Sequence, residues 1–302
     1  MKAIQILDQL KFPVELKDKI KFKLDNGFFL EVKNNVDIKT PLHYLFDLNK
    51  DSNHKNIIKI GNNSKLIFID ENISEDKELD YTCELEVILG ENSELYYLNL
   101  NNFSDKVKSV FLSKCVIEKD SKLKCFSGHL GSGILSSKRE IILNGEGSDG
   151  KNIEIVFGNK EQIFNISSNL IHKVPNTKGN VLVKNVLKDN SKMDFNGLIR
   201  IEKGAQKSDS LLQDHSILLS KNARANAIPS LEIEANDVRC THSASSGQVD
   251  EDQIFYLMSR GLDINEAEKF IVMGFLQPIL EDLNVKEVKE KIIKIIENKW
   301  NN

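Results

Sequence analysis

The chain has 302 residues and a formal net charge of -4, a length that allows one large domain or two ordinary ones. The acidic balance argues against a generally nucleic-acid-binding surface, because neutralising phosphates requires clustered Lys and Arg. The four cysteines are widely separated and form no C-x-x-C pair, which argues against a zinc ribbon or a dense disulfide framework. Reduced thiols in a cytoplasmic protein fit this pattern best.

Residues 1–22 are predicted to form a short N-terminal segment, of which residues 1–20 could be helical. Charges are scattered through its apolar residues and it contains no long apolar stretch of the kind found in signal peptides. No later run approaches the ~20 apolar residues of a membrane-spanning helix. We therefore expect no membrane association.

Residues 23–248 are predicted to form an all-β core, because short runs rich in Ile, Val, Leu and Phe are broken by Gly, Asn, Asp and Ser. A polar turn followed by a serine and a strand recurs: Ser64, Ser93 and Ser121 are separated by 29 and then 28 residues. Self-similarity at this period indicates stacked units. A parallel β-helix suits the pattern, since each coil turns on small and Asn/Asp residues while inward aliphatics stack into one core. A β-sandwich is the alternative on periodicity alone.

Residues 229–261 contain the candidate binding residues. From Leu231 to Ala235, apolar and polar residues alternate as in a strand with one buried face. Cys240 and His242 lie two apart, so in an extended segment both side chains project from one face, where a thiolate and an imidazole could share a soft or borderline metal. A cysteine in a strand is also commonly simple packing. Two ligands cannot complete a tetrahedral iron or zinc site, so others must come from elsewhere in the fold or from another subunit.

The other polar candidates are weaker. Asp214 and His215 could ligate iron weakly, but adjacent strand residues point to opposite faces, and we expect both to be solvated. The remaining histidines have no partner at ligand spacing and are predicted to be surface or turn residues: His43, His54, His129 and His172.

Residues 249–302 are predicted to be helical. Asp250 and Asp263 each precede an apolar run and have Gln or Glu three residues later, as in a capping box. Pro278 is expected to kink or end the second helix, and Asn284 to cap a third with an apolar stripe. These helices could simply cover the open end of the solenoid, since a solenoid must cover its last apolar turn.

The order of motifs in residues 229–261 resembles the C-terminal core of the SufB/SufD family of iron–sulfur cluster assembly. It reads strand, Asp-Val-basic-Cys-x-His, small residues, Gly-x-x-Asp, Phe-Tyr-Leu and Ser-Arg-Gly. Residues 195–220 and 133–148 also resemble that family. Residues before about Gly128 resemble it only in general character. The Cys-Thr-His triplet at 240–242 is similar to the SufD branch, since the SufB branch would carry Glu-His-Glu there.

This resemblance implies a right-handed parallel β-helix with a C-terminal α-helical segment, acting as a noncatalytic scaffold subunit. It implies that His242 faces the cysteine of a SufB-like partner across an interface formed by the last strands, where a nascent iron–sulfur cluster is assembled. Cys240 would be an auxiliary ligand, a sulfur way-station or a packed thiol. The C-terminal helices would dock a SufC-like ABC ATPase. End-capping and docking both predict an apolar face on these helices, but only docking predicts one left exposed in the isolated chain.

Two other functions are compatible with the residues. The chain lacks a G-x-x-x-x-G-K-[ST] phosphate loop, so any ATP hydrolysis must come from a partner. A second copy could pair with the same terminal strands in a homodimeric interaction module that binds no metal. A β-helix carbohydrate-active enzyme is less favoured, because such enzymes need clefts lined with aromatics and the aromatic content is 7%, with a single tryptophan, Trp300.

Overall fold

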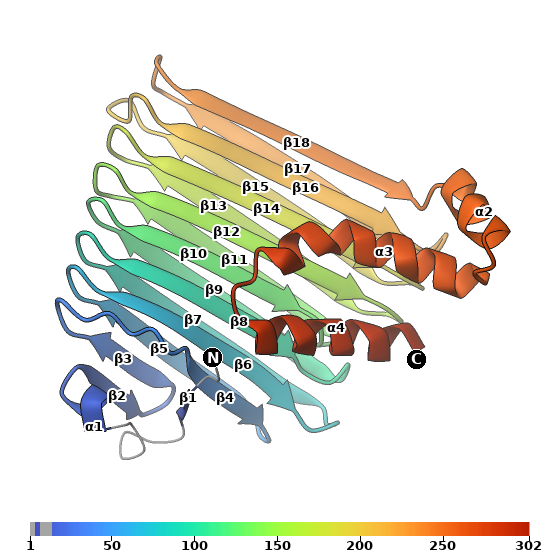
Figure 1. Ribbon diagram of the computed structural model, residues 1–302, viewed down its shortest axis with the longest axis horizontal. Helices are drawn as coiled ribbons and strands as arrows, with labels where there is room; N and C mark the ends of the chain where they lie inside the picture. The colour runs from blue at the N-terminus through green and yellow to red at the C-terminus, as the bar shows by residue number, and fades with distance from the viewer. Residues whose placement is uncertain (1–3, 7–13, 302) are drawn as a thin grey trace.

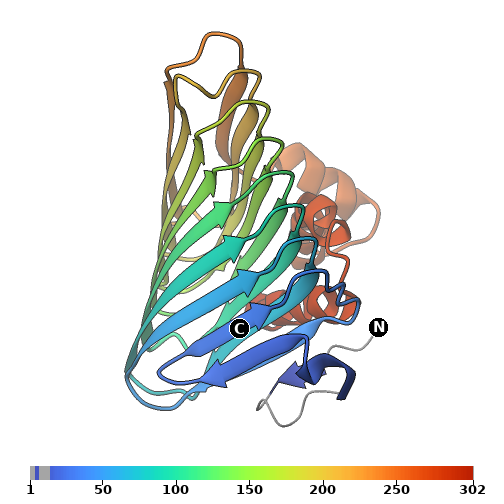
Figure 2. The same ribbon diagram turned by 90° about the vertical axis from the view of Figure 1, so that its left-hand side faces the viewer.

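The computed structural model describes residues 4–6 and 14–301, and most of them wind into a flattened parallel β-helix (Figure 1). From β3 onward successive strands alternate between two nine-stranded sheets, so each turn of the solenoid contributes one strand to each sheet. Within the described residues every pairing is parallel except β2 with β3. Figure 2 shows the turns stacked one upon another, with the last turn at the opposite end from β2 and β3. The predicted fold class is confirmed.

The first sheet, sheet A, contains β1 (Ile4–Ile6), β4 (Leu42–Leu48), β6 (Lys65–Ser74), β8 (Glu94–Asn102), β10 (Lys122–His129), β12 (Asp149–Gly158), β14 (Lys178–Leu187), β16 (Asp209–Leu218) and β18 (Arg239–Gln248). The second, sheet B, contains β2 (Ile20–Leu24), β3 (Phe28–Val32), β5 (Ser52–Ile60), β7 (Leu79–Leu89), β9 (Val107–Ile117), β11 (Ile134–Leu143), β13 (Ile163–His172), β15 (Lys192–Ile201) and β17 (Arg224–Ile233). Of the possible N-terminal helix, the described part holds only β1 and the four-residue α1 (Val14–Lys17); residues 1–3 and 7–13 lie outside the described residues.

The recurring polar segments form the turns of the solenoid, as predicted. Asn63, Asn92 and Asp120 adopt positive φ of 54°, 52° and 55°, a left-handed conformation that Asn and Asp tolerate better than most residues. The serines that follow them are fully buried and bond between turns: the Ser93 backbone N–H donates to Ser121 Oγ over 3.0 Å. The repeat therefore builds one corner of the solenoid.

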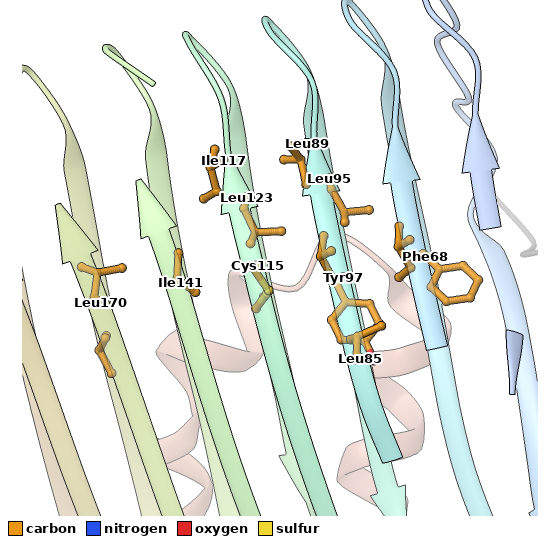
Figure 3. Close-up of a cluster of buried hydrophobic side chains, with 14 of the residues drawn as sticks. Phe68, Leu85, Leu89, Leu95, Tyr97, Cys115, Ile117, Leu123, Ile141 and Leu170 are labelled. Carbon is orange, nitrogen blue, oxygen red and sulfur yellow. The ribbon is translucent and has the colours of Figure 1, made fainter. Parts of the chain in front are cut away.

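Inward aliphatic and aromatic side chains stack into a continuous core between the sheets (Figure 3). Leu95 and Leu123 occupy the same position on neighbouring strands of sheet A, and both are 2% exposed. In-register parallel stacking repeats each inward position once per turn, so one hydrophobic residue type can fill a whole column. Cys115 and Cys125 are buried in this core as free thiols.

Three helices follow the last strand: α2 (Glu251–Ser259), α3 (Ile264–Glu281) and α4 (Lys286–Asn301). Asp263 and Glu266 form the predicted capping box, whereas the Asp250 side chain caps α2 by accepting from the Asp252 backbone N–H. Pro278 does not end α3, which continues to Glu281. A proline inside a helix removes one backbone hydrogen bond, and the packing of α3 against sheet A offsets this cost.

The helices α3 and α4 lie across the outer face of sheet A rather than over the end of the solenoid (Figure 1). Outward residues of β6 to β14 are apolar here and pack against the helices; Phe157 lies 6.3 Å from Trp300, ring centroid to ring centroid. Lysines on the sheet reach main-chain carbonyls of the helices: Lys124 Nζ donates to Asp282 O over 2.8 Å and Lys188 Nζ to Trp300 O over 3.2 Å. The end-cap interpretation is therefore wrong for α3 and α4. None of the described helices has the length and apolarity needed to cross a lipid bilayer.

The third helix also starts differently from the sequence expectation. The Val285 carbonyl accepts from the backbone N–H groups of Val288 and Lys289, so Val285, and not Asn284, stands at the start of α4. The predicted apolar stripe is present, and its members Val288, Ile292 and Ile296 are at most 4% exposed.

Candidate functional site at the open end of the solenoid

The last turn of the β-helix is uncovered. β18 is the terminal strand of sheet A and β17 the terminal strand of sheet B, so each presents one backbone edge that no strand of the described chain pairs with. An unpaired edge is a template for a strand from another molecule. Nearly all of β18 is exposed, in contrast to the alternating burial of β16 beside it.

Cys240 and His242 lie side by side on the inward face of β18, as their spacing predicted. Their neighbours in register on β16 are Ser210 and Leu212, which are 1% and 0% exposed. Among the residues that the structure describes, no further turn stacks on β18, so positions that are interior elsewhere are open here: His242 is exposed and Cys240 half-buried. The two candidate ligands therefore lie at the open end of the solenoid interior.

The chemistry of this pair requires a second molecule. Burial, followed by the charge of Asp209, raises the pKa of the Cys240 thiol to about 11, so the isolated chain presents a thiol and not a thiolate. Metal binding would have to displace this proton. Across the described ranges, no three or more His, Cys, Asp or Glu side chains gather closely enough to hold a metal ion. A stable cluster at His242 would thus need ligands from outside this chain.

Asp214 is buried one strand inside this open end, contrary to the expectation that it would be solvated. It lies on β16 in register with Ala244 of β18 and is 2% exposed. Burial raises its pKa to about 6, opposed by hydrogen bonds from Asn185 Nδ2 (2.8 Å to Oδ1) and Ser216 Oγ. His215 points to the opposite face, as predicted, where its Nδ1 lies 2.7 Å from Ser245 Oγ. The pattern of β16 marks position 214 as inward, and that signal was available in the sequence.

Of the four histidines expected at the surface or in turns, two are interior and two are partly buried. His129 and His172 are 1% and 0% exposed, and His43 Nε2 lies 3.0 Å from Glu71 Oε2. Burial lowers the pKa of His172 to about 4, and its Nδ1 lies 2.7 Å from Thr177 Oγ1. His54 is half-buried against the ring of Phe46. For His129 and His172 the reason is that polar residues share inward positions of the strands with aliphatic ones, and these positions cannot be recognised without the register.

The interior polar residues form a connected network around Glu154, which is 1% exposed. Its carboxylate accepts from Asn152 Nδ2 over 2.7 Å and from Ser168 Oγ over 2.5 Å, and it lies 2.8 Å from His129 Nε2. Arg139 Nη1 donates to Asn152 Oδ1 over 2.8 Å. Burial would raise the pKa of Glu154, but the bond and charge of His129, with Arg139 and Ser168, lower it to about 2.

A second exposed feature adjoins the open end. The helix α2 has no buried residue, and Phe255 and Phe270 are 74% and 65% exposed. With Tyr256, Met258 and Ile264 they form an apolar surface on α2 and the start of α3, which we call the α2/α3 surface. A groove between it and the ends of β16 and β18 has both apolar and polar lining residues: Leu218, Leu219, Lys221, Gln248, Val249, Glu251, Ile254, Phe255, Met258, Ile264 and Glu268. Exposed apolar surface of this kind marks interaction sites.

Comparison with known proteins identifies relatives along most of the chain. A family model described as SUF system FeS cluster assembly, SufBD core domain, matches residues 46–275. The iron-sulfur cluster assembly protein SufD of Bacillus subtilis is 32% identical over 282 residues, a match covering 91% of this chain and 64% of that relative. SufBD family proteins of Staphylococcus saprophyticus and Staphylococcus epidermidis are 26% identical over 276 residues, covering 87% of this chain and 58% of each relative. The chain thus spans less than two thirds of the length of these relatives.

Proposed function

Because the chain belongs to the SufB/SufD family of iron–sulfur cluster assembly proteins, we propose that it is a SufD-like scaffold subunit, noncatalytic by itself and working in the cytoplasm. A SufB-like chain would pair with β17 and β18, and a nascent cluster would be held between the two chains as transient cargo. The observation that carries this proposal is the pair Cys240 and His242 on the inward face of an uncovered terminal strand.

His242 is the residue we assign to the cluster. Its imidazole is exposed at the open end, whereas the Cys240 thiol is half-buried and protonated in the isolated chain. A neutral imidazole can bind iron without first losing a proton, but a thiol cannot. Cys240 would therefore join the site only after a partner or iron has changed its surroundings.

The α2/α3 surface would dock a SufC-like ABC ATPase. Its aromatic side chains are exposed in the isolated chain, which docking predicted and end-capping did not. Closure of two such ATPases on nucleotide binding would shift the paired β-helices and reshape the site around His242. The attachment of α3 to sheet A supports this coupling, because Lys184 Nζ donates to Phe275 O over 2.5 Å.

The site assignment is tested by anaerobic reconstitution with iron and sulfide. Cluster absorbance would be followed with and without a SufB-like partner and a SufC-like ATPase, for wild type, His242→Ala and Cys240→Ala. His215→Ala is the matched control, since this histidine lies on the outward face of the neighbouring strand. We expect a cluster that requires the partner, is lost in His242→Ala and is retained in His215→Ala. Equal cluster yield in His242→Ala and His215→Ala would eliminate the assignment.

The docking assignment is tested separately by pull-down with the ATPase. Phe255→Ser and Phe270→Ser should abolish capture without lowering the melting temperature, because both side chains are mainly in solvent. Leu112→Ser on the outer face of sheet B is the control for an exposed apolar residue, at 41% exposure. Capture of all variants at the wild-type level would remove the α2/α3 surface as the docking site.

A homodimeric interaction module without metal is the second candidate, favoured by the same unpaired edges of β17 and β18. Metal retention separates the two functions. A purified dimer that never acquires iron or sulfide, with or without a SufB-like partner, would favour the interaction module.

A further inference from the structure

We propose that the interior of the solenoid binds one hard divalent cation, such as Mn²⁺ or Fe²⁺, through the side chains of Asp214, Asn185 and Ser216. The site lies on the inward faces of β14 and β16, one strand inside the open end. It needs neither a second chain nor a cluster, so it does not rest on the proposed function. Its basis is a buried carboxylate without a counter-charge beside an amide oxygen without a partner.

The carboxylate of Asp214 is held only by neutral groups. Within the described part of the chain, its hydrogen bonds come from Asn185 Nδ2 over 2.8 Å and from Ser216 Oγ over 3.4 Å. Burial raises the pKa of Asp214 to about 6, so the carboxyl group is still mostly ionised at pH 7. A buried ionised carboxylate is costly unless a cationic side chain pairs with it or a metal ion binds it.

Glu154 shows how the solenoid neutralises a carboxylate at the same inward position. Glu154 and Asp214 lie in one column of sheet A, two strands apart. Glu154 has the charge of Arg139, a residue of sheet B, close to it. The column of sheet B that contains Arg139 continues towards the open end through Gly197 and Pro229, neither of which has a polar side chain. That column therefore supplies no counter-charge for Asp214, and a cation from solution can take this role.

The side-chain amide of Asn185 carries an unused oxygen next to this carboxylate. Asn185 is 1% exposed, and its Nδ2 donates to Ser216 Oγ over 3.0 Å as well as to Asp214. Its Oδ1 is buried and has no hydrogen-bond partner among the described residues. A buried acceptor without a partner is costly and uncommon. Rotation of this amide directs Oδ1 towards a cation bound to Asp214, and Ser216 Oγ supplies a third oxygen.

The three oxygens define the class of ion. Carboxylate and carbonyl oxygens suit hard cations such as Mg²⁺ and Mn²⁺, whereas soft ions select thiolates. Ca²⁺ takes about six to eight oxygens, but a smaller ion keeps several of its waters and needs few protein ligands. Fe²⁺ stands next to Mn²⁺ in the order of affinities and can occupy the same site. With a single carboxylate ligand, we expect a dissociation constant of about 10⁻⁴ M.

The open end provides the route to this site. Ala244 and Ser246 of β18 lie in register with Asp214 and Ser216, and both are small, uncharged and exposed. Asp70 lies in the same column but five strands further from the open end, where its carboxylate accepts from Tyr97 Oη over 2.6 Å. We therefore expect the cation to bind at Asp214 and not at Asp70.

The test is a titration of the full chain, purified without metal, sulfide or partner, with Mn²⁺, in which electron paramagnetic resonance measures the free ion. One Mn²⁺ per chain should bind. Asp214→Asn should weaken binding about tenfold or more, because it removes the only charged ligand. Asp70→Asn, and Asp209→Asn at the exposed start of β16, are the matched controls and should bind as wild type does. His242→Ala should also retain the ion.

The melting temperature gives a second measurement, and circular dichroism verifies that each variant is folded. Mn²⁺ should raise the melting temperature of wild type and of Asp209→Asn but not that of Asp214→Asn. Equal Mn²⁺ affinity in wild type and Asp214→Asn would overturn the proposal, as would the absence of stoichiometric binding by wild type. A loss in His242→Ala as large as in Asp214→Asn would place the ion at the candidate cluster ligand instead. Because no partner or sulfide is present, these results are independent of cluster yield.

Discussion

The buried carboxylate of Glu154 is predicted to stabilise the fold strongly, and Glu154→Gln isolates its charge. The substitution keeps the shape and retains an oxygen for Asn152 and Ser168. It places an amide nitrogen where His129 Nε2 now meets a carboxylate oxygen, and it leaves the charge of Arg139 without its buried counter-charge. Breaking one side of a buried ion pair is costlier than removing both, because an uncompensated charge remains in the core.

The magnitude follows from the pKa. The pKa of Glu154 falls from 4.5 to about 2 in the folded chain. One pKa unit corresponds to 1.36 kcal/mol, so the charge contributes about 3 kcal/mol. A lowered folded pKa means that this stability is fully present above pH 4.5 and is lost as the pH falls towards 2. Glu154→Gln should therefore cost about 3 kcal/mol at pH 7 and much less at pH 3.

Urea unfolding at pH 7 and pH 3 measures both values, with Glu91→Gln, an exposed turn residue, as the control. The double variant Arg139→Met with Glu154→Gln should be more stable than the sum of the single changes, because it removes the orphaned guanidinium. A pH-independent loss, or a loss no larger than that of Glu91→Gln, would refute the reasoning.

The sequence predicts the solenoid well because its strongest constraints are local. A left-handed turn residue followed by a buried serine repeats at almost constant spacing, and each repeat forms the same corner of the solenoid. The same holds for Cys240 and His242, whose common face follows from the period of a strand. Helix starts at Asp250 and Asp263 were equally readable, since capping is decided within a few residues.

What could not be predicted depends on contacts between turns. His129 and Glu154 lie 25 residues apart in the chain and meet only because neighbouring strands are in register. The burial of Asp214 likewise depends on which residue of β16 faces inward, and a one-residue slip would reverse it. The packing of α3 and α4 on the outer face of sheet A could not be predicted either, because it also depends on which residues of each strand face outward. Outward apolar residues such as Phe126 look identical to core residues in the sequence.

Two further perturbations separate charge from packing. Burial raises the pKa of Asp214 from 3.8 to about 6, so its contribution is full below pH 3.8 and lost as the pH rises through 6. Asp214→Asn should consequently gain up to about 3 kcal/mol over wild type at pH 8 and little at pH 4, and equal melting shifts at both values would contradict this. Trp300→Ala removes a side chain of α4 that is 8% exposed and packs against sheet A, at a cost of about 3 kcal/mol or more. Because Trp300 touches sheet A only from outside, α4 should become sensitive to limited proteolysis while the β-helix stays folded. An unchanged cleavage rate together with a lower melting temperature of the whole chain would mean that the helices and the solenoid unfold as one unit.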